Sequence, residues 1–296
     1  MKIIDVINRI MDFHCRLDHS RFDKVLYGET DRECTGVVTT CCCTVDVIRQ
    51  AAAVGANLIV CHEDLFFTSF DDPDLIAGVA LVDEKKRVLD ECGITVWRNH
   101  DHIHGNSNKP FIPGKPGEKP NVLLWKNRPS MPREKTDYIF YGIMKVLGWE
   151  EYVQDDIKKP LLYEIPETDV PSLCRFFMDK FHLNGLRIVG DAKAPVRRVF
   201  FAEHMNDRSD EALYQRMSEL NADVFVPLEI VDWTLSEYVR DAVALGQRKA
   251  IIEMGHFNCE EPGMEWMAQD WLPRILGQAV PITFIRSGDS FSYMVR

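Results

Sequence analysis

The feature that most constrains the fold of this chain is an alternation of short apolar runs with helical patterns, which occurs in both halves of the sequence. Strands that are separated by helices in this way are typical of parallel sheets with crossover connections. The expected strands are GVVTTCCC (36–43), ANLIVCH (56–62), GITVWRNH (93–100), RRVFFAEH (197–204), ADVFVPLE (222–229) and KAIIEMGH (249–256), and the expected helices are 44–54, 74–92 and two that begin near Asp210 and Leu235. We therefore predict an α/β fold with mainly parallel sheets.

The two halves of the chain also match each other in sequence. When Ala56 is set against Ala222, ANLIVCHE lies over ADVFVPLE and Glu63 falls on Glu229. Glu63 then follows the second strand of the first half, and Glu229 is the last residue of the second strand of the second half. Because open α/β sheets bind ligands beyond the carboxyl ends of their strands, we expect functional residues at these positions.

The third expected strand of each half repeats this relation. It ends in His100 in the first half and in His256 in the second. A further potential ligand, His104 or Glu260, follows four residues later. We interpret the two halves as similar α/β lobes that carry functional residues at equivalent strand ends.

The expected lobes are residues 1–130, with two clusters of potential metal ligands, and residues 131–296, with a third cluster. Between them, residues 105–135 contain six of the fifteen prolines and many lysines, which predicts a long irregular loop. This loop could be a lid that positions a substrate, or an exposed insertion that contacts another subunit.

Composition narrows the class of protein. The 296 residues carry a net charge of −11, which disfavours nucleic acid or an anionic membrane as the main partner. No apolar run approaches the roughly 20 residues of a membrane helix. Residues 1–13 have apolar side chains at helical spacing instead of the pattern of a signal peptide. We expect a cytoplasmic globular protein that binds neither nucleic acid nor membrane.

The nine cysteines include no CxxC pair. Cys41, Cys42 and Cys43 are consecutive in an expected strand, where neighbours point to opposite faces and cannot chelate one ion together. We interpret the cysteines as small buried side chains of a protein in a reducing compartment. Cys61 and Cys259 are adjacent to histidine clusters, so these two could take part in a site.

Three clusters of histidine and carboxylate residues follow expected strands. They are His62 and Glu63 in CHEDLFF, His100, Asp101, His102 and His104 in NHDHIH, and His256 and Glu260 in GHFNCEE. Imidazole and carboxylate ligands without thiolates suit zinc, iron, manganese, cobalt or nickel. One ion takes three or four protein ligands, so six good candidates fit two ions bridged by a carboxylate and lying about 3.5–4 Å apart.

Each cluster has a simpler interpretation when it is taken alone. The first could be a hydrogen-bonded histidine at a sheet edge, the second a solvated loop, and the third a charged pair at a helix start. Their coincidence at equivalent strand ends favours metal binding. Which histidines of the second cluster bind remains open, because an extended chain would put His100, His102 and His104 on one face, whereas a turn would pair His100 with His104.

A family resemblance adds to this interpretation. The segments GANLIVCHEDLFF, NHDHIH and IIEMGHFNCEEPG resemble the three signatures of the NIF-three-like dinuclear metal-centre family, whose bacterial members are often described as type-2 GTP cyclohydrolase I-like. The resemblance extends from FDKVLYG near the start to the last strands. It implies a subunit of two α/β lobes that assembles into a ring-shaped hexamer, with metal sites facing an internal cavity.

The resemblance also implies a ligand set. The family's HHP pattern maps onto residues 62–64, so that its second histidine is Glu63 here, and its HTNLD pattern maps onto residues 100–104, so that its aspartate is His104. Its GHYATE-like pattern maps onto His256 and Glu260. The six implied metal ligands are therefore His62, Glu63, His100, His104, His256 and Glu260. The chain departs from the family in the second lobe, where Glu229 lies near the position of an aspartate and Trp233 replaces a histidine.

From these residues we predict a metal-dependent hydrolase that acts on an unidentified small molecule. Two divalent transition-metal ions (zinc, iron, manganese or nickel) would activate a water and polarise the substrate. By analogy, Glu260 would bridge the ions, and Glu229 or Asp101 would be the general base. His102 would lie beside the ligands or contact the substrate.

A non-catalytic role is the alternative. Six ligands describe a site and not a reaction, so the chain could be a metal-binding assembly that acts as a scaffold, chaperone or metal store. A nucleotide enzyme of the cyclohydrolase type is a variant of the hydrolase hypothesis, although the sequence contains no glycine-rich loop of the P-loop kind.

Overall fold

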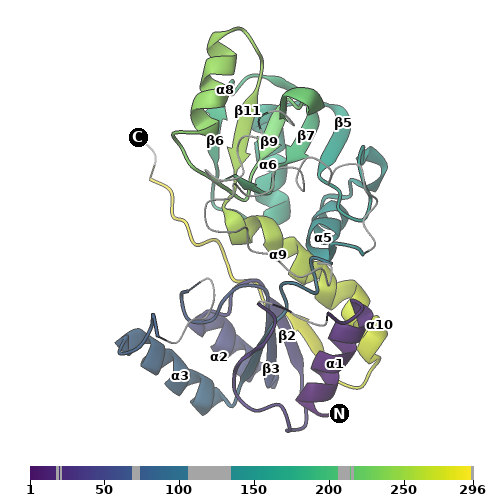
Figure 1. Ribbon diagram of the computed structural model, residues 1–296, viewed down its shortest axis with the longest axis vertical. Coiled ribbons are helices and arrows are strands. Elements are labelled where there is room, and N and C mark those ends of the chain that lie inside the picture. The colour runs from purple at the N-terminus through teal and green to yellow at the C-terminus, as the bar shows by residue number, and fades with distance from the viewer. Residues whose placement is uncertain are drawn as a thin grey trace, which may run out of the picture. The chain divides into compact units, whose positions relative to one another are not determined.

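The computed structural model describes residues 1–17, 20, 22–68, 74–105, 135–205, 214 and 217–294. These residues form two compact units, each built on a five-stranded sheet (Figure 1). Unit one comprises the described residues of Met1–Asn108, Lys135–Ile143 and Glu260–Ser287, and unit two comprises those of Met144–Cys259 and Gly288–Arg296. The predicted α/β fold with two similar units and mainly parallel sheets is confirmed.

Unit one contains a sheet with the strand order β1-β4-β3-β2-β12. Strands β2, β3, β4 and β12 run parallel, and β1 runs antiparallel to β4. The strands are β1 (Val25–Tyr27), β2 (Val37–Thr40), β3 (Leu58–Cys61), β4 (Thr95–Arg98) and β12 (Ile282–Phe284). The helices are α1 (Ile3–Phe13), α2 (Val45–Ala53), α3 (Ala80–Cys92), the first part of α5 (Tyr138–Leu147), most of α9 (His256–Trp266), the π-helical η3 (Met267–Trp271) and α10 (Leu272–Leu276).

The central strands of unit one are covered on both faces. Every residue of β2, β3 and β4 is buried. Parallel strands of this kind appear in a sequence as continuous apolar runs without alternation, which is why they could be predicted. The amphipathic first helix was likewise predictable, because α1 buries a helically spaced apolar stripe of Ile3, Val6, Ile7 and Ile10.

Two glycines allow α5 and α9 to approach each other closely within unit one. A Cβ atom added to Gly263 would lie 2.6 Å from Cα of Ile139, and one added to Gly142 would lie 2.6 Å from Cα of Gly263. Any side chain at either position would therefore push the helix backbones apart. This contact fixes α9, and with it Glu260, against the start of α5.

Unit two contains a sheet with the order β5-β7-β9-β11-β6, together with a small parallel pair of β8 and β10. Strands β7, β9 and β11 run parallel, and β5 and β6 are antiparallel edges. The strands are β5 (Leu162–Asp169), β6 (Arg187–Gly190), β7 (Pro195–Phe201), β8 (His204–Met205), β9 (Val224–Val226), β10 (Glu229–Ile230) and β11 (Ala250–Glu253). The helices are the end of α5, η2 (Glu150–Tyr152), α6 (Val170–Phe181), α8 (Leu235–Ala244) and the start of α9.

The strand register supports the match between the two halves of the sequence. Leu58 is the first residue of β3 and Val224 is the first residue of β9, and each pairs in parallel register with a strand on both sides. Ala56 and Ala222 each lie two residues earlier. The two middle strands are therefore equivalent in the alignment that places Glu63 on Glu229.

The third strands match with an offset of one residue. Thr95 pairs with the first residue of β3, and Ala250 pairs with the first residue of β9, so these two positions correspond. Five residues further on, His100 corresponds to Gly255, next to His256. The two ligand-bearing segments therefore leave equivalent strands, but their histidines differ by one position.

Several element boundaries differ from the predicted ones. The first strand ends at Thr40, and Cys41 and Cys42 lie in a bend. The helix expected from residue 74 begins only at Ala80, and Pro227 separates β9 from β10 in the strand expected over 222–229. Unit one is also not one continuous stretch, because β12 near the end of the chain pairs with β2.

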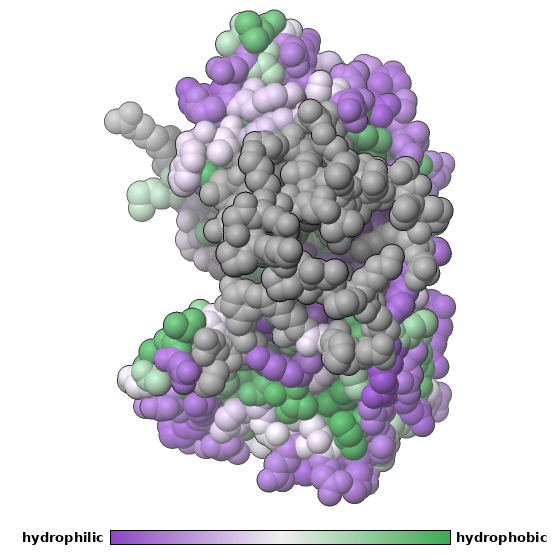
Figure 2. Space-filling view, viewed as in Figure 1, coloured by the Kyte–Doolittle hydropathy of each residue, from purple (hydrophilic) through white to green (hydrophobic). Residues whose placement is uncertain are grey.

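Three other predictions lie outside the described residues. These are the loop of 105–135 beyond its ends, the start of the helix expected near residue 210, and the lobe boundary between residues 130 and 131. Within the described part of the chain, no helix is both long and apolar enough to span a bilayer. On the face drawn in Figure 2, hydrophilic side chains cover much of the described surface of each unit.

Candidate metal sites

The loop after β3 positions the first two expected ligands. The backbone N–H groups of His62 and Glu63 both donate to the carbonyl of Cys41, at 3.0 and 2.9 Å. From the other side, buried Arg98 at the end of β4 donates to the carbonyl of His62 at 3.0 Å and to the carboxylate of Glu63 at 3.1 Å. The loop is therefore held between the exits of β2 and β4.

A single aspartate shapes the turn that carries the next cluster. The carboxylate of Asp23 accepts the consecutive backbone N–H groups of His100, Asp101 and His102, at 2.6, 2.7 and 2.9 Å. The N–H of His104 donates to the carbonyl of His100 at 3.2 Å, which closes the turn. The chain is thus turned and not extended here, which is the arrangement expected to pair His100 with His104.

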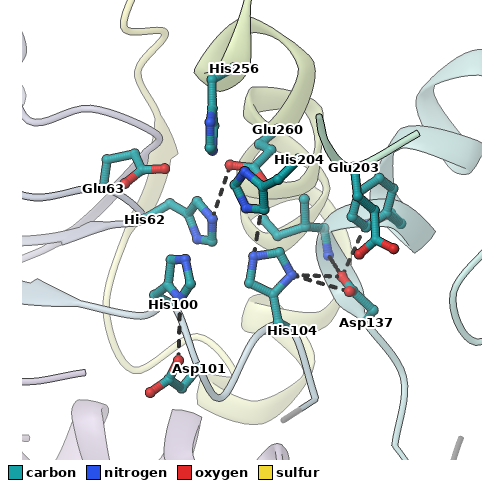
Figure 3. Close-up of polar contacts among 12 residues, drawn as sticks. His62, Glu63, His100, Asp101, His104, Asp137, Glu203, His204, His256 and Glu260 are labelled. Carbon is teal, nitrogen blue, oxygen red and sulfur yellow. Dashed lines mark hydrogen bonds and ion pairs between the residues drawn. The ribbon is translucent and has the colours of Figure 1, made fainter. Parts of the chain in front are cut away.

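Three imidazole rings meet in unit one. The ring centroids of His62 and His100 lie 4.8 Å apart, those of His62 and His104 5.0 Å apart, and those of His100 and His104 4.9 Å apart. One ring nitrogen of each lies within 4.8 Å of the other two, and Figure 3 shows the rings facing one another. The side chain of His62 is fully buried, whereas those of His100 and His104 are 20% and 14% exposed.

Each of these rings has its Nδ1 atom against an oxygen that accepts hydrogen bonds. The pairs are His62 with the carbonyl of Asn99 (3.1 Å), His100 with the carboxylate of Asp101 (3.2 Å) and His104 with the carboxylate of Asp137 (3.1 and 3.2 Å). Because the oxygen can only accept, Nδ1 carries the hydrogen and Nε2 is left with a lone pair. Histidines that bind metals are usually oriented in this way.

Glu260 on α9 brings a buried carboxylate to these rings. Its Oε2 lies 3.3 Å from Nε2 of His62, and its Oε1 lies 3.9 Å from Nε2 of His104. Two donors that are each about 2.1 Å from one ion lie about 3 Å apart at a right angle and about 4.2 Å apart at most. Both separations therefore fit a shared cation, and the two oxygens face different histidines.

The environment of His62 indicates that a positive charge belongs between these groups. Its Nε2 is buried and makes no hydrogen bond among the described residues. Burial alone would lower the pKa of His62, but the carboxylates of Glu260 and Glu63 outweigh it and raise this pKa. A lone pair facing a carboxylate is repulsive, so a proton or a metal ion stabilises the arrangement. The residues present thus fit a cation.

The remaining expected residues of unit one have other contacts. His102 uses both ring nitrogens, since its Nε2 accepts the N–H of Leu17 at 3.1 Å and its Nδ1 contacts the carboxylate of Asp23. Asp101, besides contacting His100, accepts the hydroxyl of Ser20 at 2.8 Å. Burial lowers the pKa of His100 to about 4, which keeps this ring neutral at pH 7. Both ring nitrogens of His102 thus contact other protein groups, and the carboxylate of Asp101 contacts Nδ1 of His100.

Unit two contains a separate cluster of His204, Glu229 and His256. The two oxygens of Glu229 accept from Nδ1 of His204 at 2.7 Å and from Nδ1 of His256 at 2.8 Å. Burial would raise the pKa of Glu229, but these hydrogen bonds outweigh it and lower the pKa to about 2. His256 is the first residue of α9, one turn before Glu260 on the same helix.

Four residues that support or extend these clusters were not among the site residues predicted from the sequence. They are Asp23, Asn99, Asp137 and His204. Asp137 precedes the apolar run of α5 and accepts two backbone N–H groups at its start, so a helix-cap search would have found it. His204 also ends an expected strand, RRVFFAEH, which was a usable signal. Asp23 and the carbonyl of Asn99 have no local signature.

The fold and the clusters define an α/β protein of two similar units, with candidate metal ligands at strand ends. No family model matches the chain. A curated relative from Clostridium perfringens, named GTP cyclohydrolase 1 type 2 homolog, is 23% identical over 267 residues and covers 88% of each chain. Two crystal structures share the fold over 99% of both chains: a hypothetical protein of Staphylococcus aureus (TM-score 0.65, 19% identity) and a Bacillus cereus protein related to NIF3 (TM-score 0.61, 14% identity). The chain is thus similar in sequence to a GTP cyclohydrolase 1 type 2 homolog and shares its fold with a protein related to NIF3, as the resemblance to the NIF-three-like family predicts.

Proposed function

We propose that this protein is a metal-dependent hydrolase whose centre lies in unit one. Its ligands are His62, Glu63, His100, His104 and Glu260. The observation that carries the proposal is that all three histidines are held through Nδ1, which leaves Nε2 for a metal. Two divalent transition-metal ions (zinc, iron, manganese or nickel) suit these nitrogen and oxygen donors.

Glu260 is proposed as the bridging ligand of this pair of ions. One of its oxygens faces His62 and the other faces His104, at 3.3 and 3.9 Å. Glu63 lies beside them, since His62, Glu63 and Glu260 also form a group of potential ligands within 4.8 Å. His256, the sixth expected ligand, stays a prediction; within unit two its Nδ1 lies 2.8 Å from the carboxylate of Glu229.

When bound, such ions supply a water of lowered pKa and polarise an oxygen of the substrate. The residues of the chain provide orientation and charge. Asp101 and Asp137 hold His100 and His104 in the tautomer that a metal requires, and Arg98 fixes the carboxylate of Glu63. Either Glu229 or Asp101 was expected to act as the general base. We now propose an orienting role for both, because each carboxylate already accepts a histidine N–H.

The names of the relatives indicate only a class of reaction. The Clostridium perfringens relative is named a GTP cyclohydrolase homolog, so hydrolytic opening of a purine ring is the first reaction to test. A non-catalytic metal-binding assembly, as a scaffold, chaperone or metal store, remains the second candidate. The full burial of His62 and Glu260 favours it, because closed sites are typical of structural metals. A homohexamer is part of both proposals.

Elemental analysis of the purified protein tests the centre directly. We expect close to two transition-metal ions per wild-type chain in this centre, and the loss of both in His62→Ala and in Glu260→Gln. His182→Asn is a matched control, because His182 is exposed at the end of α6, where its left-handed conformation suits asparagine. Unchanged metal content in both site variants would contradict the proposal. A metal-loaded protein that hydrolyses neither GTP nor a panel of amides and phosphoesters would favour the storage role.

A further inference from the structure

We propose that residues 288–294 form a strap that positions His256 by holding the start of α9. The inference deepens the proposed function and rests on it, because His256 is the sixth expected ligand of the metal centre. The strap has no regular secondary structure and is drawn in Figure 1 as an irregular yellow trace. It belongs to unit two together with the start of α9, and the contacts that carry the proposal all lie within this unit.

The carboxylate of Asp289 ties the strap to two other segments of unit two. Its Oδ2 accepts the backbone N–H of Asn184, in the loop between α6 and β6, at 3.0 Å. Its Oδ1 accepts Nδ2 of the buried Asn258 at 3.2 Å and the N–H of Phe291 at 2.9 Å. Asn258 lies in the first turn of α9 and also donates to the carbonyl of Met254 at 2.8 Å. One carboxylate therefore links the strap to the first turn of α9.

The ring of Tyr293 packs against Gly185 in the loop between α6 and β6. A Cβ atom added to Gly185 would lie 2.7 Å from Cδ2 and 2.8 Å from Cγ of this ring. Gly185 does not have a positive φ, so its own backbone would accept a side chain. Among the described residues, the ring of Tyr293 is thus the group that requires a glycine at position 185.

The ring of Phe291 packs in a similar way against Gly255, the residue before His256. A Cβ atom added to Gly255 would lie 2.9 Å from Cε2 of Phe291, and the φ of 95° at Gly255 also suits only glycine. The carbonyl of Gly255 accepts the N–H of Cys259 at 3.1 Å, which closes the first turn of α9. Phe291 therefore contacts the backbone at the point where α9 begins.

His256 is consequently held in two ways. Its ring is oriented through Nδ1 by Glu229 at 2.8 Å, and its backbone is held by the strap. A metal ligand must lie within about 0.5 Å of its productive position, so both constraints matter for binding. The residues Phe291 and Tyr293 are 50% and 38% exposed, so each ring can be removed without leaving a cavity in the core of the unit.

Two measurements on the full-length protein test this inference. Hydrogen exchange of the metal-free protein, followed by mass spectrometry, measures local opening at the start of α9. Chelator competition gives the Zn²⁺ affinity, and visible absorption of bound Co²⁺ reports a change of coordination that a merely structural role would not produce. The variants are Tyr293→Ala, Gly185→Ala, Phe291→Ala and the conservative Phe291→Leu. Met294→Ala is the matched control, because Met294 lies on the same segment and is 99% exposed.

We expect faster exchange at the start of α9 and about tenfold weaker Zn²⁺ binding in Phe291→Ala, Tyr293→Ala and Gly185→Ala. Phe291→Leu should retain most of the affinity, and Met294→Ala should match the wild type. Gly185→Ala should have no further effect in the Tyr293→Ala background, because the ring that the new methyl group would meet is absent. In the His256→Ala background, no strap variant should change the Zn²⁺ affinity.

Wild-type exchange at the start of α9 in both Phe291→Ala and Tyr293→Ala would overturn the strap. Faster exchange with unchanged Zn²⁺ affinity, or an affinity loss that persists in the His256→Ala background, would overturn the positioning of His256. If His62→Ala and Glu260→Gln bind as much metal as the wild type, the centre proposed for unit one fails. The exchange data then decide by themselves whether the strap holds the start of α9.

Discussion

Replacing Asp137 by asparagine separates two roles that one buried carboxylate has in unit one. Asp137 accepts the hydrogen of His104 Nδ1 at 3.1 and 3.2 Å, and it also accepts the N–H groups of Ile139 and Phe140 at the start of α5, both at 3.2 Å. The residue is fully buried. It therefore caps a helix and orients a proposed metal ligand at the same time.

Asparagine caps helices about as well as aspartate does, so Asp137→Asn should keep most of the stability of the metal-free protein. It loses the negative charge that orients His104. Removing such a partner of a metal-bound histidine typically weakens metal binding about 10–100-fold, which corresponds to about 1.4–2.7 kcal/mol. Asp137→Ala should lose this affinity and, in addition, about 0.5–2 kcal/mol of unfolding free energy from the lost cap.

Two measurements distinguish these effects. Chelator competition with Zn²⁺ gives the affinity, and urea unfolding of the metal-free protein gives the stability. Asp169→Asn is the matched control, because Asp169 caps α6 through the N–H of Ser172 at 2.7 Å and has no histidine contact among the described residues. An affinity within threefold of the wild type for Asp137→Asn would refute the orienting role of Asp137.

Three further predictions follow from unit one. His102→Ala should lower the free energy of unfolding by about 3 kcal/mol, because its buried hydrogen bonds to Asp23 and to a backbone N–H are lost. The affinity for Zn²⁺ should not change. Weaker Zn²⁺ binding would show that His102 is a ligand. Burial lowers the pKa of His14 from 6.5 to about 3, so the unfolded chain binds a proton first and wild-type stability should fall as the pH drops from 6.5 toward 3. In urea midpoints measured over this pH range, His14→Phe should show a smaller fall, and an identical slope would contradict the assignment. Gly263→Ala places a Cβ 2.6 Å from Cα of Ile139 and should cost about 1–3 kcal/mol in urea unfolding; wild-type stability would mean that the helices separate freely.

The parts of the site that the sequence predicted are those with a local pattern. His62, Glu63, His100, His104, His256 and Glu260 were found because each lies at or just after the end of a predicted strand. Parallel strands bring such positions to one sheet edge, so an ordered list of strand ends is also a list of candidate ligands. His204 meets the same criterion, because it is the last residue of the expected strand 197–204.

The partners of these side chains could not be predicted. Asp23 precedes the turn that it shapes by more than seventy residues, and Asp137 is 33 residues from His104. Hydrogen bonds between such distant segments depend on the packing of complete elements and leave no periodic trace in the sequence. For the same reason, the sequence did not show that the carboxylates of Asp101 and Glu229 each lie against a histidine ring.

The sequence by itself therefore determined the α/β class, the similarity of the two units and the kind of donor that collects at the strand ends. These properties depend on local hydrophobic period and on the order of elements along the chain. Only the tertiary structure decided that the chain turns at His100, that His102 is occupied on both ring nitrogens, and that Nδ1 of His256 lies against Glu229. Those outcomes depend on which oxygen lies beside each Nδ1 atom, and that oxygen comes from the neighbouring residue in some cases and from a distant part of the chain in others.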